Sequence, residues 1–262
     1  GSAFLKVHCS GSGFISVHSR TELLVEFRTG SISTKPNSVL RSGLVANRLK
    51  DLEIEYPNWI ARILRTIQDT GHGGTVLISP DSNPNDISLK YECQSAALSI
   101  SFSKLWEKTR EINGAIRQVN STNDVHELKA LTQQLLRAFD FDVDIQDDVQ
   151  RNARTIARLA AVDGAVLLGR NFTLLGFGGK IDAPSSLSNV IRAKDSEGTD
   201  LEQMDTSERG NRLISAISFC NANPSAIAFV GSQDGPVSAV LKHDANVIVW
   251  DDIETVPPLP QS

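Results

Sequence analysis

The sequence predicts an α/β protein with a mixed, twisted central sheet flanked by helices. Helical segments alternate with short apolar runs, such as residues 75–78, that are typical of buried strands. Three glycine turns, around Gly73, around Gly164 and over residues 231–235, adjoin these runs. Apolar residues make up 40% of the chain and charged residues 22%, as in ordinary globular proteins. We therefore expect one packed domain over residues 3–255.

The first half of the chain begins with short apolar runs separated by glycine and serine turns. Residues 3–35 predict two or three strands at the N-terminus. A helix is expected after Pro57, because apolar residues recur there at helical spacing, and a buried strand follows at 75–78. Residues 82–90 are polar and are expected to form a loop. Residues 96–102 fit either a strand or the start of a helix.

A helical insertion is expected at about residues 105–155. Residues 105–119 and 123–139 have helical periodicity, and a further helix is expected over 149–161. Between them, residues 140–148 contain five aspartates. We expect a solvated loop there that leads into a helix N-terminus, where carboxylates complement the helix dipole. A divalent-metal site is the alternative, although the aspartates lack the ordered spacing of a calcium loop.

The second half of the chain repeats the order of helix and strand. Residues 162–169 form an apolar run, and 172–181 is its expected hairpin partner. The polar stretch 182–209 is expected to be a long ordered loop or a mobile lid. A helix over 211–221, a buried strand over 226–230, a turn over 231–236 and closing strands at 237–241 and 247–250 complete the prediction.

Composition narrows the classes of partner. The net charge of −5 argues against sequence-independent binding to a nucleic acid polymer, which requires a basic surface. Binding of a small phosphate ligand is compatible with this net charge, because it needs only a few local hydrogen-bond donors. Cys9, Cys93 and Cys220 are far apart, so we expect reduced thiols and no disulfide framework. No apolar run approaches the ~20 residues of a spanning helix, so we expect no membrane segment and a cytoplasmic location.

Neither end of the sequence is expected to belong to the folded domain. Residues 1–2 are interpreted as a cloning scar and are left out of the fold prediction. Residues 256–262 are rich in proline and are interpreted as a linker that is cut short. We therefore expect an effector domain C-terminal to this module in the parent protein.

Asp163 is the most informative polar residue of the predicted sheet. It opens an apolar run and precedes a glycine, and a buried carboxylate without a partner is costly. One interpretation is a local hydrogen bond at a turn or helix end. The other is contact with a ligand hydroxyl or with a metal that bridges phosphates. Glycines beside it would let the backbone approach phosphate oxygens.

The order of several short motifs resembles the diadenylate cyclase (DAC) family. The segment Asp163-Gly164-Ala165-Val166 is similar to the Asp-Gly-Ala-Val motif of that family. Residues 74–78, which follow a predicted helix, are similar to its Gly-Ala/Thr-Leu-Ile strand. Residues 210–216 align with its Gly-Thr-Arg-His-Arg-Ala-Ala helix, and 230–238 with its Val-Ser-Glu-Glu-Thr-Gly turn. The resemblance covers about residues 59–250 and implies a diadenylate-cyclase-like fold.

The departures from the family pattern affect the expected activity. Of the Arg-His-Arg triplet that binds triphosphate in the cyclases, only Arg212 is present, because Leu213 and Ile214 replace the other two residues. Ser232 and Gln233 stand where the cyclases supply an acidic metal ligand. This pattern is similar to that of the catalytically degenerate DACNV-type sensor domains, which are linked to bacterial antiphage signalling.

The resemblance therefore implies a non-catalytic sensor that binds a nucleotide or cyclic nucleotide second messenger and regulates an attached effector. An active diadenylate cyclase that makes cyclic di-AMP from ATP is the alternative, and a dimerising scaffold without a ligand is a third hypothesis. No cofactor is required, except Mg²⁺ or Mn²⁺ if a nucleotide triphosphate binds. A second copy of the chain is a further candidate partner.

Each candidate residue has an expected role in the sensor. Asp163 would contact a ribose hydroxyl or a metal, the glycines would allow close backbone approach, and Lys180 and Arg212 would lie near phosphate. A surface salt bridge is the alternative role for Arg212. The candidate ligand-binding residues are Asp163, Gly164, Ala165, Gly178, Gly179, Lys180, Arg212, Ser232, Gln233 and Asp234.

Overall fold

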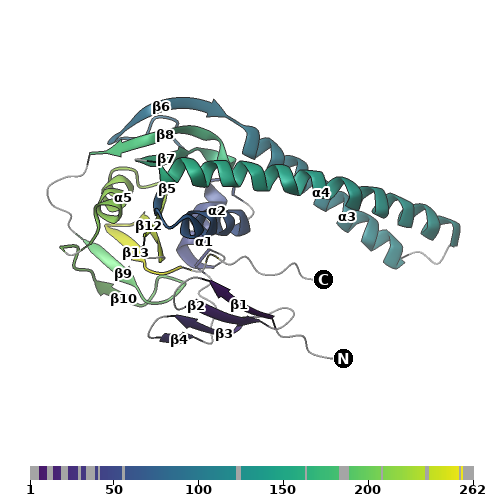
Figure 1. Ribbon diagram of the computed structural model, residues 1–262, viewed down its shortest axis with the longest axis horizontal. Coiled ribbons are helices and arrows are strands. Elements are labelled where there is room, and N and C mark those ends of the chain that lie inside the picture. Colours follow the sequence, from purple (N-terminus) through teal and green to yellow (C-terminus); the bar gives the residue numbers. More distant parts are fainter. Residues whose placement is uncertain are drawn as a thin grey trace.

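The architecture of the chain comes from a computed structural model (Figure 1). It describes residues 6–10, 14–18, 23–28, 31–33, 39–40, 42–54, 57–121, 125–162, 164–182, 189–207, 209–233, 236–253 and 255. Two candidate site residues, Asp163 and Asp234, lie outside the described residues, as do the ends at 1–2 and 256–262.

The centre of the molecule is a mixed nine-stranded sheet, which confirms the predicted α/β class. Its strand order is β10-β9-β13-β12-β11-β5-β7-β8-β6. The central strands β5 (Gly74–Ile78) and β7 (Ala165–Leu168) are parallel to each other, and β11 (Ile227–Gly231) pairs antiparallel with β5. The remaining strands are β6 (Ile87–Ser95), β8 (Leu174–Ile181), β9 (Val190–Ala193), β10 (Leu201–Gln203), β12 (Val237–His243) and β13 (Asn246–Trp250).

Helices cover both faces of this sheet. One face packs against α1 (Gly43–Asp51), α2 (Pro57–Thr70) and the end of α4 (Val125–Ala161), and the other face packs against α5 (Asn211–Ala222). Alternate residues of β5 divide between the two cores, with Val76 and Ile78 on the first side and Leu77 on the second. The neighbouring strands β7 and β11 are apolar at every position because both of their faces are buried.

A helical hairpin extends away from the sheet (Figure 1). It consists of α3 (Ala97–Ser121) and α4, which has 37 residues and so a length of ~55 Å at the usual rise per residue. This hairpin occupies the place of the predicted insertion at 105–155, with wider bounds. A separate antiparallel sheet at the N-terminus consists of β1 (Lys6–Ser10), β2 (Phe14–His18), β3 (Leu23–Arg28) and β4 (Ser31–Ser33).

Three local predictions are wrong. Residues 140–148 are helical and belong to α4, because Ile145 in this stretch and Val149 just after it pack into the core and keep the helical periodicity. The loop expected at 82–90 ends at β6, an edge strand with exposed polar residues at alternate positions and hence without an apolar run. The stretch 182–209 contains β9 and β10, so it is not one long loop.

The short helix α1 and the 3-10 turn at Arg170–Phe172 had no counterpart in the prediction. Arg48 at the end of α1 fixes this helix to the body of the domain. Its guanidinium donates to the backbone carbonyls of Pro224, Ala226 and Lys242, the last two at 2.8 and 3.1 Å. Burial lowers the pKa of Arg48, and the three carbonyls give its charge a set of acceptors.

Candidate functional site

A cavity of about 760 Å³ opens at one edge of the central sheet, between the N-terminus of α5 and the ends of β11 and β13. Its volume lies within the range of small-molecule binding sites. The lining residues come from four segments that are distant in the sequence. They are Arg209, Gly210, Asn211, Arg212, Leu213, Val230, Gly231, Ser232, Gln233, Pro236, Ser238, Asp251 and Asp252.

The N-terminus of α5 forms one wall of this cavity. Its N-cap is Gly210, which has no side chain to bond the first backbone N–H groups, and no acidic residue lies in the first turn. A Cβ added to Gly210 would meet no atom within 4 Å, so the space in front of the helix is open. The first N–H groups of a helix have no intrahelical acceptor and carry positive partial charge. This wall therefore suits an anionic group.

Arg212 stands at the second position of α5 and is exposed. Within the described part of the chain it forms no ion pair, so the alternative role, a surface salt bridge, is not seen there. Its Nη1 would lie 2.8 Å from a Cβ built on Gly73, which places the guanidinium against the turn before β5. A charged donor fork beside a helix N-terminus is an arrangement that favours phosphate or carboxylate.

Gly73 brings the α2–β5 turn against the cavity wall. Its φ is +66°, and a Cβ at this position would lie 2.6 Å from the carbonyl oxygen of Gly231 and 3.2 Å from the backbone nitrogen of Gln233. Only glycine allows this combination of left-handed backbone and close approach. The glycine turns predicted around Gly73 and at 231–235 therefore meet each other at the edge of the sheet.

The opposite wall is held by a network of charges around Asp251. The carboxylate accepts from Arg192 Nε at 3.0 Å, from Arg209 Nη2 at 3.2 Å and from the Ser238 hydroxyl at 3.2 Å. Two guanidinium groups thus offset the charge of Asp251, so the cavity is not dominated by negative charge. The same bonds fix Arg209 at the rim of the cavity.

The β7–β8 residues form a second group on the same edge of the sheet. Ala165 is buried at the start of β7 and pairs with Thr75 of β5 and with Gly179 of β8. Gly164 has a φ of +108°, and a Cβ there would lie 2.7 Å from the carbonyl carbon of Gly178. Lys180 is exposed. Because β11, β5 and β7 are neighbours, Gly231 and Ala165 are separated by two strand spacings, or roughly 10 Å.

The predicted site residues therefore fall into two groups. Arg212, Ser232 and Gln233 line the cavity, whereas the candidates on β7 and β8 lie further along the edge and are not among its lining residues. Asp163, which directly precedes Gly164 in the sequence, and Asp234 both lie outside the described part of the chain. Among described residues, no three histidine, cysteine, aspartate or glutamate side chains are grouped as metal ligands.

Sequence reasoning missed several residues of the cavity, namely Arg209, Gly210, Asn211, Ser238, Asp251 and Asp252. One signal was present for the aspartates, because Asp251 and Asp252 directly follow the last buried strand. Polar residues at the end of a buried strand reach the edge of the sheet, where loops diverge. Arg209 carried no such signal, since its position depends on the tertiary bond to Asp251.

None of the helices in the described ranges is long and apolar enough to span a membrane. The sequence was compared with models of known protein families, and none matches. A comparison with curated proteins also gives no match.

Proposed function

We propose that this chain is a sensor module that binds a nucleotide or cyclic nucleotide at the edge of its central sheet. The observation that carries the proposal is the cavity in which Arg212 and an uncapped helix N-terminus face the same open space. Such a site supplies backbone and guanidinium donors for a phosphate group.

The remainder of the cavity suits the other parts of a nucleotide. Oxygen-bearing side chains line this part of the cavity at Ser232, Ser238 and Asp252. A serine hydroxyl can donate or accept a hydrogen bond and a carboxylate can accept one, which suits the hydroxyls of a ribose and the amino group of a base. The same edge continues from Gly73 to Gly164, and Ala165 beside Gly164 lies roughly 10 Å from Gly231. A ligand with two or three nucleotide units has the length to reach from Arg212 toward Gly164.

The replaced triphosphate-binding residues favour sensing over synthesis. Leu213 is 8% exposed and lies on the buried face of α5, and Ile214 is half-buried; both side chains are apolar, so neither offers a donor to a second phosphate. Cyclisation of two nucleotide triphosphates needs several neutralising groups for the polyphosphate. Arg209 is the other cation on the cavity wall, and Asp251 already pairs with it.

Two assays on the same preparation test the proposal. Calorimetric titration with a panel of cyclic di- and trinucleotides should give saturable binding for at least one of them. Incubation with ATP and Mg²⁺ or Mn²⁺, followed by chromatography, should give no cyclic product. Absence of binding across the panel contradicts the sensor, and formation of cyclic di-AMP would establish the cyclase alternative. Regulation of an attached effector in bacterial antiphage signalling is the output that we propose for such a sensor.

A further inference from the structure

Helix α4 carries a charged stripe whose residues are not among those that line the cavity. Charged residues recur along it at alternating intervals of four and three positions, first three aspartates and then three arginines. The stripe consists of Asp140, Asp144, Asp147, Arg151, Arg154 and Arg158. This spacing places all six positions on one face of a helix.

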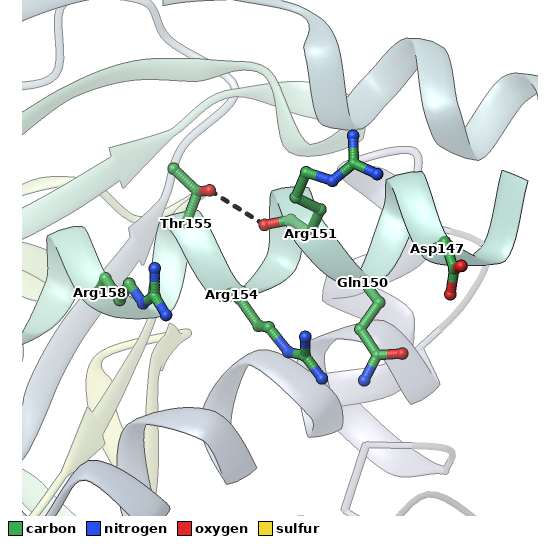
Figure 2. Close-up of a pocket in the computed structure, with 6 residues that line it drawn as sticks. All are labelled: Asp147, Gln150, Arg151, Arg154, Thr155 and Arg158. Atoms are coloured by element: carbon green, nitrogen blue, oxygen red, sulfur yellow. Dashed lines mark hydrogen bonds between the residues drawn. The ribbon is translucent and has the colours of Figure 1, made fainter. Parts of the chain in front are cut away.

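The part of the stripe from Asp147 to Arg158 faces away from the core. Asp147 and the three arginines are exposed, whereas the buried residues of this part of α4 are Ile145, Val149, Ala153, Ile156, Ala157 and Ala160. Figure 2 shows the arginine half of the stripe, where Gln150 and Thr155 complete a shallow hollow of about 390 Å³ on the helix surface. The exposed face of α4 is therefore strongly charged and is not used in packing the domain.

Like charges lie next to each other within each half of the stripe. Arginines three and four residues apart repel one another, and so do aspartates at those spacings. In the arginine half, Arg151 forms an ion pair with Asp148 at 3.3 Å, and the two side chains are 75% and 55% exposed. For Arg154 and Arg158, no ion pair occurs within the described ranges. Within the described residues, Arg154 and Arg158 are thus cations without an ion-pair partner in the single chain.

The pattern is complementary to itself when it is reversed. We propose that α4 packs antiparallel against α4 of a second copy of this chain, with the two-fold axis at the level of Val149. A two-fold axis at this level places residue n of one copy opposite residue 298 − n of the other, and every arginine of the stripe then faces an aspartate of the second copy. The matches are Arg151 with Asp147, Arg154 with Asp144 and Arg158 with Asp140 of the second copy.

A second copy fits this surface better than a nucleic acid does. The aspartate half would repel a phosphate backbone, and the net charge of the chain is −5. An isologous pair, in contrast, uses both halves at once because each chain supplies the same patch. Charges of this kind set the register and orientation of an interface more than its affinity, and salt screens them. The pair should therefore be specific in register and weakened by salt.

Charge reversal at one matched pair provides the test. Positions 154 and 144 meet twice in the dimer, once on each side of the two-fold axis. In a dimer of Arg154→Asp both meetings join two aspartates, and in a dimer of Asp144→Arg both join two arginines. Each variant alone should dissociate at least about tenfold more readily than the original chain, since attraction is replaced by repulsion at two places. Mixing the two variants restores opposite charges at both places, so a mixed dimer should form. The double variant Arg154→Asp/Asp144→Arg should dimerise by itself for the same reason.

Sedimentation equilibrium over a concentration series measures these states, and circular dichroism confirms that each variant is folded. Arg110→Asp, on α3, is the control with the same change of charge on an exposed residue outside the stripe, and it should leave dimerisation unchanged. If the original chain is monomeric at all concentrations, the proposal is contradicted. The same holds if the chain stays monomeric and uses Arg154 to bind an oligonucleotide. Reversal variants that dimerise as the original chain does, or that fail to associate when mixed, also contradict it.

Discussion

Gly73 and Gly71 provide a matched pair for testing how the cavity wall is built. Both glycines have a φ of +66°, in the same turn between α2 and β5. A Cβ on Gly71 would meet nothing within 4 Å, whereas one on Gly73 would lie 2.6 Å from the carbonyl oxygen of Gly231. Substitution of each by alanine therefore imposes the same backbone strain, and only Gly73→Ala adds a steric clash.

The expected magnitudes follow from these two differences. A left-handed backbone costs an alanine about 1–2 kcal/mol, and the reduced entropy of the unfolded chain offsets about 0.4–1 kcal/mol. Gly71→Ala should therefore lower the free energy of unfolding by about 1 kcal/mol. The overlap at Gly73 involves backbone atoms, which cannot rotate away, and overpacking of this kind costs about 1–3 kcal/mol more. Gly73→Ala should lose about 3 kcal/mol in total.

Urea denaturation of the original chain and the two variants measures the difference. A gap of about 2 kcal/mol between the variants corresponds to roughly 1 M in the midpoint, at a slope of about 2 kcal/mol per molar. Equal midpoints for Gly71→Ala and Gly73→Ala would refute the close contact between the α2–β5 turn and the β11 end. The cavity wall would then have a different construction from the one described.

Three further outcomes are expected. Gly210→Asp should raise the free energy of unfolding by a few tenths of a kcal/mol in urea, because it caps α5, and should weaken binding of a phosphate ligand about tenfold in calorimetry; unchanged affinity would exclude the helix N-terminus from the site. Arg48→Met should lower the free energy of unfolding by about 2–3 kcal/mol, since three hydrogen bonds to carbonyls are lost, and a loss below 0.5 kcal/mol, roughly that of a surface change, would contradict its role. Burial raises the pKa of Cys220 to about 12, so stability is retained below the ordinary thiol pKa and falls as pH rises from about 9 toward 12; Cys220→Ala should remove this part of the alkaline loss in pH-dependent unfolding.

The sequence predicted the central part of the fold because its strands have both faces buried. Continuous apolar runs at 75–78 and 226–230 and helical periodicity after Pro57 are strong local signals, and these elements are found where expected. Edge strand β6 and strands β9 and β10 lack such runs. Their pairing depends on neighbours that are distant in the chain, so the sequence alone indicated loops.

The candidate site was predicted in part for a related reason. Arg212, Ser232 and Gln233 adjoin a glycine turn or a helix start, which local patterns identify, and they line one cavity. The opposite wall depends on the bonds of Asp251 to Arg192 and Arg209, residues 59 and 42 positions away in the chain. No local spacing encodes such a contact. The aspartates of α4 misled the prediction because polar composition was given more weight than the apolar positions between them.

The most direct test of the central claim is calorimetric titration of the cyclic nucleotide panel into the original chain, Arg212→Lys and Arg212→Ala. Arg212 is exposed and forms no ion pair among the described residues, so both variants should unfold at the same temperature as the original chain. We predict saturable binding to the original chain, a smaller loss in Arg212→Lys and a loss of at least about tenfold in Arg212→Ala. No binding by the original chain, or equal affinity in all three proteins, would contradict a nucleotide site at this cavity.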